Sequence, residues 1–249
     1  MKFYCYGAEG LPVVMLIHGG GNSKWMFERA ARLMEDKYRI IVPELDGHGE
    51  EHAIMYMSTR EEAEKIIRYI DENLDGRLFC IAGASLGSQI AMEILGTRPR
   101  IADRAFLESG ICRPKKALAK LMSRRMIGAM EKMYQWKWLV RLQCKYSGWP
   151  MEIADKITED VKAVSADSNY NLYRTYFSYE LPGGLRQTTA KVLVICGSKE
   201  SRAMKAEIRY AASQIPGSQT DVFEGCGHCG CSLGNPRAYA DKLQGFMES

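Results

Sequence analysis

Residues 79–95 read FCIAGASLGSQIAMEIL, and this stretch decides how the chain is expected to fold. An apolar run rich in strand formers ends at Gly83, and a helical pattern begins at Ser85. Because Gly83 and Gly87 have no side chains, they permit the sharp, strained turn that carries a strand directly into a helix. Such a turn holds the Ser85 hydroxyl above a sheet, which makes this serine a candidate nucleophile. The alternative is that Ser85 only caps the helix.

The same alternation of strand and helix continues through most of the chain. Short apolar runs predict strands at residues 12–19, 38–45, 76–83, 103–110, 190–198 and 218–225. Amphipathic stretches predict helices at residues 24–35, 60–73, 85–96, 201–214 and 236–248. This order predicts an α/β protein with a mostly parallel sheet, helices on both faces, and ligands at the carboxyl ends of the strands.

The segment 112–185 interrupts this pattern because it is helical and contains no convincing strand. We interpret it as a helical cap inserted over the strand ends of one core, which residues 1–111 and 186–249 form. No apolar run approaches the ~18 residues of a membrane span, and the first residues do not resemble a secretory signal. We therefore expect a cytoplasmic protein without stable membrane insertion, whose eight cysteines are reduced thiols.

A serine hydroxyl is a weak nucleophile and needs a base that a third group orients. The chain has four histidines, of which His18, His48 and His52 lie in early loops. His228 follows the last strand on a short loop that can reach Ser85, so it is the predicted base. Glu200, three residues after Gly197 in VICGSKES, is the predicted acid, and Glu108 at another strand end is the reserve candidate. The alternative for Glu200 is a first-turn helix residue that the helix dipole favours.

Backbone N–H groups are the predicted donors to an oxyanion that develops on a substrate. One belongs to Leu86, directly after the serine, and the other to Gly20 in the loop HGGGNS. This glycine run lacks the spacing of known phosphate-binding loops. The residues predicted to bind substrate are Gly19 in the same loop and Met122, Met126 and Trp136 in the cap.

Four motifs, in this order, resemble the α/β-hydrolase superfamily and, within it, the capped serine esterases and lipases. VVMLIHGGGNSKWMF resembles the oxyanion loop, GASLGSQIAMEI the nucleophile elbow, VICGSKE the acid-bearing strand end, and GCGHCGCSLGNPRAYADKLQGFM the histidine loop and final helix. The resemblance implies a serine hydrolase that cleaves small or medium carboxylic esters through an acyl-enzyme, with no metal and no organic cofactor. Three features depart from the family: Glu200 replaces the commoner aspartate, LDGHGEE replaces a proline-glycine-histidine-glycine loop, and Ser88 replaces a second glycine.

Several alternatives stay open at the level of sequence. The same triad would serve a thioesterase, a lysophospholipase or monoacylglycerol lipase, a C–C bond hydrolase, or a signalling protein that binds a ligand and turns it over slowly. The run CGHCGC also brings Cys226, His228, Cys229 and Cys231 within six residues. A structural zinc site usually draws a second pair of ligands from elsewhere, and the other cysteines form no such pair.

The basic residues of the chain are concentrated in the predicted cap. Between Arg113 and Lys145 there are ten basic residues and one acid, Glu131, whereas the whole chain carries a formal net charge of +4. Interleaved with them are Leu118, Met122, Met126, Met130 and Met133, followed by Trp136, Trp138 and Trp149. One interpretation is a solvated basic face over a methionine stripe that packs on the core. The other is a methionine-lined acyl pocket beneath a basic face that attracts anionic substrates or an anionic lipid surface, and no motif points to nucleic acid.

Overall fold

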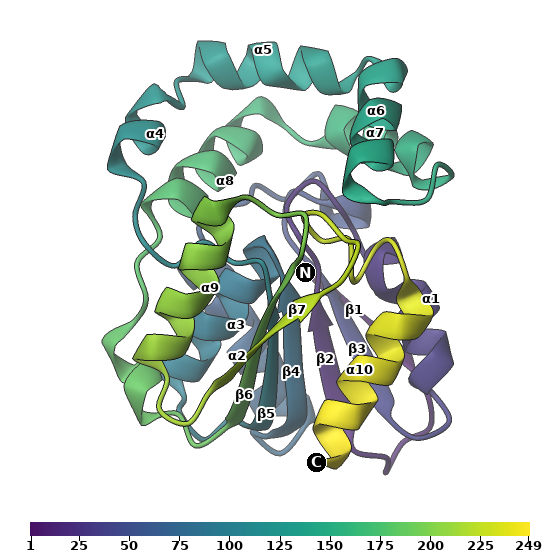
Figure 1. The fold of residues 1–249 in the computed structure, drawn as a ribbon, viewed down its shortest axis with the longest axis vertical. Coiled ribbons are helices and arrows are strands. Elements are labelled where there is room, and N and C mark those ends of the chain that lie inside the picture. The colour runs from purple at the N-terminus through teal and green to yellow at the C-terminus, as the bar shows by residue number, and fades with distance from the viewer.

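The computed structural model describes residues 1–249 and contains one seven-stranded sheet (Figure 1). The strands are β1 (Lys2–Tyr6), β2 (Val13–Ile17), β3 (Arg39–Glu44), β4 (Leu78–Ala84), β5 (Ala102–Glu108), β6 (Lys191–Gly197) and β7 (Gln219–Phe223). Their spatial order is β1-β3-β2-β4-β5-β6-β7, in which β1 pairs antiparallel with β3 and all other pairs are parallel. The predicted α/β-hydrolase fold with a mostly parallel sheet is confirmed.

Helices cover both faces of the sheet, which explains why its central strands β2 and β4 carry no charged residue. One face carries α1 (Trp25–Met34) and α10 (Pro236–Glu248), and the other carries α2 (Thr59–Asn73), α3 (Leu86–Thr97) and α9 (Arg202–Gln214). Successive side chains of a strand point to opposite faces. Leu16 of β2 therefore packs with α1 and α10, and Ile17 packs in the core on the other face.

Five helices follow β5 and lie above the carboxyl ends of the strands (Figure 1). They are α4 (Lys116–Leu121), α5 (Arg124–Tyr134), α6 (Lys137–Ser147), α7 (Ile153–Ala163) and α8 (Ala166–Ser178). Two short 3₁₀ helices, η1 (Gly49–Glu51) and η2 (Gly183–Gln187), complete the elements. A ligand at the strand ends would therefore lie between the sheet and these five helices. None of the helices combines the length and the apolar composition that a membrane crossing requires.

Only β1 is absent from the strands predicted from the sequence. It lies at the edge of the sheet, where Lys2 and Cys5 are exposed and the other side chains are half-buried. The strand forms because its backbone pairs with β3, Phe3 opposite Pro43. An edge strand of this kind carries no run of buried residues, so its sequence pattern is weak.

Candidate active site

Ser85 lies at the turn from β4 into α3, with φ 54° and ψ −110°. This backbone conformation is strained for a residue with a side chain. The turn is also tightly packed: a Cβ on Gly83 would lie 2.2 Å from the Gly87 carbonyl oxygen, and one on Gly87 would lie 2.0 Å from that of Ile17. Both glycines are therefore required by close approach of the backbone. The Ser85 hydroxyl makes no capping hydrogen bond to α3, so the helix-cap alternative is wrong.

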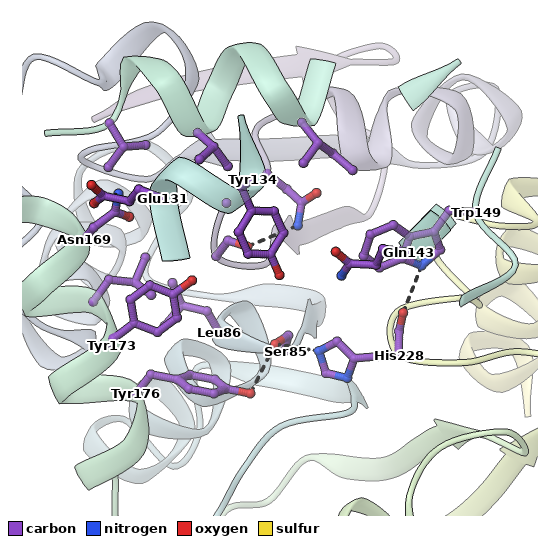
Figure 2. Close-up of a pocket in the computed structure, with 17 residues that line it drawn as sticks. Ser85, Leu86, Glu131, Tyr134, Gln143, Trp149, Asn169, Tyr173, Tyr176 and His228 are labelled. Carbon is purple, nitrogen blue, oxygen red and sulfur yellow. Dashed lines mark hydrogen bonds between the residues drawn. The ribbon is translucent and has the colours of Figure 1, made fainter. Parts of the chain in front are cut away.

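Three side chains form a chain of hydrogen bonds at the strand ends. The Oγ atom of Ser85 lies 3.1 Å from Nε2 of His228 (Figure 2), and Nδ1 of His228 lies 3.1 Å from Oε2 of Glu200. When Nδ1 carries the ring proton and donates a hydrogen bond to the carboxylate, Nε2 is free to accept the serine proton. The three residues follow β4, β7 and β6, so strands far apart in the sequence bring them together.

The Glu200 carboxylate is held from two sides. Its Oε2 atom faces His228, and its Oε1 atom accepts a hydrogen bond from the Ser109 hydroxyl at the end of β5. The residue that caps α9 is Ser201, whose hydroxyl accepts the N–H of Met204. Glu200 therefore lies outside the helix, and the alternative of a first-turn helix residue is wrong. Ser109 is a site residue that the sequence analysis did not identify.

The reserve candidate, Glu108, is not in hydrogen-bond contact with His228. Its side chain is fully buried. Because alternate strand residues share a face, Glu108 points to the same face of the sheet as Phe106, which α10 covers. One carboxylate oxygen accepts the Cys231 N–H at 3.3 Å. Burial raises the pKa of Glu108. Glu108 thus supports the loop that carries the histidine, whereas Glu200 contacts the imidazole ring.

The surroundings of His228 set its position and its basicity. Trp149, which follows α6, donates its indole N–H to the His228 carbonyl oxygen at 2.9 Å. Burial opposes the charged imidazolium, but Cys229 and Glu200 stabilise it, and the pKa of His228 lies well above its usual value. Burial also raises the pKa of the Cys229 thiol. Glu200 also accepts a hydrogen bond from the imidazole ring at 3.1 Å.

Backbone N–H groups border the cavity on the side of the glycine-rich loop. Gly20 and Leu86 both line the cavity beside Ser85, and Leu86 is the first residue of α3, where helix N–H groups have no partner within the helix. The N–H of Gly19 instead contacts the Met26 sulfur at 3.3 Å. Gly19 is also absent from the cavity lining, although the sequence predicts it to bind substrate.

His18 supports this loop from within the core. Its Nδ1–H donates to the Gly19 carbonyl oxygen at 2.9 Å, and its Nε2 accepts the Leu45 N–H at 3.1 Å. Only a neutral ring can make both bonds, and burial lowers the pKa of His18 to about 3. His48 is likewise buried, with its ring 5.3 Å from that of His18. His228 is the one histidine in the cavity lining.

A cavity of about 200 Å³ lies above Ser85, between the strand ends and helices α5 to α8 (Figure 2). Its lining consists of Gly20, Gly21, Asn22, Ser85, Leu86, Glu131, Tyr134, Gln143, Trp149, Ile157, Val161, Val164, Asn169, Leu172, Tyr173, Tyr176 and His228. It includes no lysine or arginine, and its one acid is Glu131, whose Oε1 accepts the Asn169 side-chain N–H at 2.7 Å. The interior therefore offers an anionic substrate no ion-pair partner besides the histidine.

Tyr176 of α8 brings the cap into contact with the serine. Its hydroxyl lies 3.3 Å from the Ser85 Oγ atom, and a dashed line marks this hydrogen bond in Figure 2. Gln89 of α3 donates its side-chain N–H groups to the carbonyl oxygens of Tyr176 at 3.1 Å and Ile111 at 2.9 Å, which ties α8 to the core. The sequence gives no signal for Tyr176, because only the packing of the cap brings it to the elbow.

None of the three cap residues predicted to bind substrate, Met122, Met126 and Trp136, lines the cavity. Helix α5 turns Ile127, Glu131 and Tyr134 inward at helical spacing, whereas Met126 is exposed. Met122 is buried away from the cavity, and Trp136 is exposed. Because α5 and α6 carry apolar residues on both faces, the spacing alone indicates the wrong inward face.

Comparisons with known proteins agree with this architecture. A family model described as "Alpha/beta hydrolase family" matches residues 14–242. An uncharacterized protein of Mycobacterium tuberculosis is 22% identical, over 96% of this chain and 76% of that protein.

Solved structures of hydrolases superpose on nearly the whole chain. A thermophilic esterase from Thermogutta terrifontis, solved with malate bound, has a TM-score of 0.82 at 19% identity and covers 99% of this chain and 92% of its own. The enol-lactonase from Burkholderia xenovorans LB400 has a TM-score of 0.82 at 14% identity and covers 100% of this chain and 96% of its own. At such identities the likeness shows a shared fold.

Proposed function

Because the chain belongs to the alpha/beta hydrolase family, we propose that it is a serine hydrolase of carboxylic esters with small or medium acyl groups. The proposed triad is Ser85, His228 and Glu200. One observation carries the proposal: two successive hydrogen bonds of 3.1 Å join the three side chains beside a cavity. This is the arrangement of nucleophile, base and orienting acid that activates a serine on unrelated folds.

In the first half of the reaction, Nε2 of His228 takes the hydroxyl proton while Oγ of Ser85 bonds to the acyl carbon. Glu200 accepts the Nδ1–H bond and stabilises the imidazolium that forms. The N–H groups of Gly20 and Leu86 stabilise the negative charge on the former carbonyl oxygen. Removal of one such donor lowers kcat by ~10²–10³-fold. The imidazolium then gives its proton to the departing alcohol, and the acyl group stays on the serine.

In the second half, water replaces the alcohol. His228 takes a proton from the water, whose oxygen attacks the acyl carbon, and the serine leaves with that proton. Residues 112–185 act as a cap in this scheme, because the tyrosines and tryptophan that they contribute to the lining limit the access of bulk water. Tyr176 contacts the serine oxygen directly. An acyl group bound to Ser85 would therefore contact the cap.

The chemistry of the lining narrows the substrate class. Apolar and aromatic side chains predominate, and the one polar pair at the cap end of the cavity is Glu131 with Asn169. A neutral ester fits this lining better than an anionic one, since burying an unpaired anion is costly. A thioester, a lysophospholipid, a monoacylglycerol or a cleavable C–C bond could react with the same three residues, and a graded substrate panel separates these cases.

The decisive experiment is Ser85→Ala, with Ser88→Ala as the matched control on the next turn of α3. Ser85→Ala should abolish labelling by a fluorophosphonate probe and lower kcat for p-nitrophenyl esters by ~10⁴–10⁶. Ser88→Ala should be labelled and active, because the Ser88 hydroxyl is buried without a hydrogen-bond partner. Unchanged labelling of Ser85→Ala would overturn the proposal. A single burst of product followed by negligible turnover would favour a ligand-binding, signalling role.

A further inference from the structure

The outer surface of the cap exposes more large apolar side chains than the rest of the molecule. Of twelve exposed large hydrophobic residues, eight lie between residues 121 and 151. They are Leu121, Met126, Met133, Trp136, Trp138, Leu142, Tyr146 and Met151. Single exposed apolar residues are ordinary on protein surfaces, but a concentration of this kind marks an interaction site.

Helix α6 shows the pattern most clearly. Trp138, Leu142 and Tyr146 follow one another at i, i+4 and i+8, and they are 63%, 56% and 76% exposed. The opposite face of the same helix buries Val140 and Cys144. A helix that packs on a core by one face normally presents polar residues on the other. The apolar outer stripe of α6 therefore has no partner within the chain.

The cap also carries basic residues that no acid neutralises. Of the ten between Arg113 and Lys145, four form ion pairs: Arg113 and Lys115 with Glu207, Arg124 with Asp167, and Lys137 with Asp155. The other six are exposed and lack an acidic partner: Lys116, Lys120, Arg125, Lys132, Arg141 and Lys145. Two of these, Arg141 and Lys145, lie on α6 at i+3 and i+7 from Trp138, directly beside the apolar stripe.

We propose that this outer face of α4, α5 and α6 docks reversibly on an anionic lipid surface. Segments that lie in a membrane interface typically combine apolar side chains with lysine and arginine. The aliphatic parts of the lysine and arginine side chains are buried there, and their charged ends contact anionic head groups. Trp136 and Trp138 stack with their ring centroids 6.2 Å apart, and tryptophan is favoured at the level of the head groups.

Two other occupants fit the face less well. A second copy of the chain would bring six unpaired positive charges against the same six, which is repulsive. A nucleic acid would satisfy the charges, but it would leave the leucine and methionine side chains unburied. An anionic bilayer satisfies both the charge and the apolar surface.

The docking face adjoins the catalytic cavity. An outer groove of about 580 Å³ is lined by residues of α5 and α6, and two of its lining residues, Tyr134 and Gln143, also line the cavity above Ser85. Docking would therefore hold the cavity wall close to the lipid. The proposal concerns binding alone and does not rest on ester hydrolysis, so it is tested on wild-type protein and on Ser85→Ala in parallel.

The test is co-sedimentation of the full chain with vesicles of phosphatidylcholine, alone or with about one third phosphatidylglycerol. We expect binding to the anionic vesicles to be at least about tenfold stronger at low salt and to fall in about 0.5 M salt, where the Debye length is well below 10 Å. Equal binding to both vesicles, or no binding to the anionic ones, would overturn the proposal. So would tighter binding to single-stranded DNA, or a dimer in size-exclusion chromatography that Trp138→Ser abolishes.

Two sets of variants separate the apolar from the charged part of the face. Trp138→Ser with Leu142→Ser should weaken vesicle binding about tenfold by removing buried apolar area, and Arg141→Gln with Lys145→Gln should weaken binding to anionic vesicles alone. Val222→Ser removes an exposed apolar residue, 42% exposed, from β7 and is the control, expected to bind as wild type. All variants should hydrolyse a water-soluble ester at the wild-type rate. Wild-type binding by both double variants would refute the assignment of this face.

Discussion

At the scale of single residues, two glutamates at neighbouring strand ends have different environments because their side chains leave the backbone in different directions. Glu108 is the last residue of β5, so the strand pleat points it to the α10 face. Glu200 lies three residues beyond the end of β6, before the cap residue of α9, and turns toward His228. The backbone geometry therefore decides which carboxylate can orient the imidazole.

This difference predicts the outcome of matched substitutions. Glu200→Gln should lower kcat by orders of magnitude, about 10⁴ by analogy with loss of the third triad member elsewhere, because a neutral amide no longer fixes the tautomer. Glu108→Gln should change kcat little, since its carboxyl bonds the loop backbone and not the ring. Steady-state kinetics on both purified variants makes the comparison. The reverse order would transfer the role of the acid to Glu108.

The pH dependence follows from the basicity of His228. The base must be neutral, so kcat/KM should rise with pH as the imidazolium loses its proton. Because Cys229 and Glu200 together raise the pKa of His228 despite its burial, the half-maximal rate should lie above the ~6.5 of an ordinary histidine. In Glu200→Gln the imidazolium loses this stabilisation, and the midpoint should move to lower pH. A flat profile between about pH 5 and 9 would contradict the role of His228.

The residues that the sequence did not reveal share a physical cause. Ser85, His228 and Glu200 could be predicted because each stands at a fixed place relative to a strand. Ser109 and Tyr176 act by contact across the fold, each 91 positions from its partner in the chain. No local spacing encodes such a contact.

At the scale of elements, one buried carboxylate joins the start of segment 112–185 to the core. Glu207 of α9 accepts the backbone N–H groups of Cys112 and Arg113, both at 3.0 Å, where the chain leaves β5. It also pairs with the side chains of Arg113 and Lys115. Burial opposes its charge, but Lys115 and Arg113 hold the pKa of Glu207 below its usual value. The charged form therefore stabilises the native state.

We expect Glu207→Ala to lower the free energy of unfolding by about 3 kcal/mol, because it leaves two backbone donors and two cations without their partner. Urea denaturation at neutral pH measures the loss, with Glu72→Ala on the exposed face of α2 as the control. Since a depressed pKa stabilises only while the group is ionised, the difference from wild type should shrink as the pH falls below about 4. A loss no larger than that of Glu72→Ala would contradict this role.

The elements themselves differ in how well their sequences encode them. Six strands and five helices could be predicted because burial on both faces or an amphipathic stripe leaves a clear pattern. The edge strand β1 and the inward face of α5 could not, because exposed and buried positions of these segments carry similar side chains.

At the scale of the whole molecule, the outer surface of the cap and the cavity beneath it carry charges of opposite sign. Six unpaired basic residues cover the outer surface, while the cavity holds one acid, Glu131, and no lysine or arginine. A positive surface raises the local concentration of anions. Its electrostatic field acts over a long range, and salt screens it. The lining acts at contact distance, where screening is weak, and it favours neutral substrates. The two effects therefore separate in their response to salt.

This separation predicts a two-part result for a neutral and an anionic ester of equal chain length. The kcat/KM of the anionic ester should fall between low salt and about 0.5 M, because the Debye length contracts well below 10 Å, whereas the neutral ester should respond little. At every salt concentration the neutral ester should remain the better substrate, because the cavity lining contains no lysine or arginine to pair with the anion. Glu131→Gln should narrow that gap by removing the repulsion inside the cavity, and it should leave the slope of the salt response unchanged. Equal salt responses of the two esters would mean that the basic face exerts no steering, and a preference for the anionic ester in high salt would mean that the lining does not select by charge.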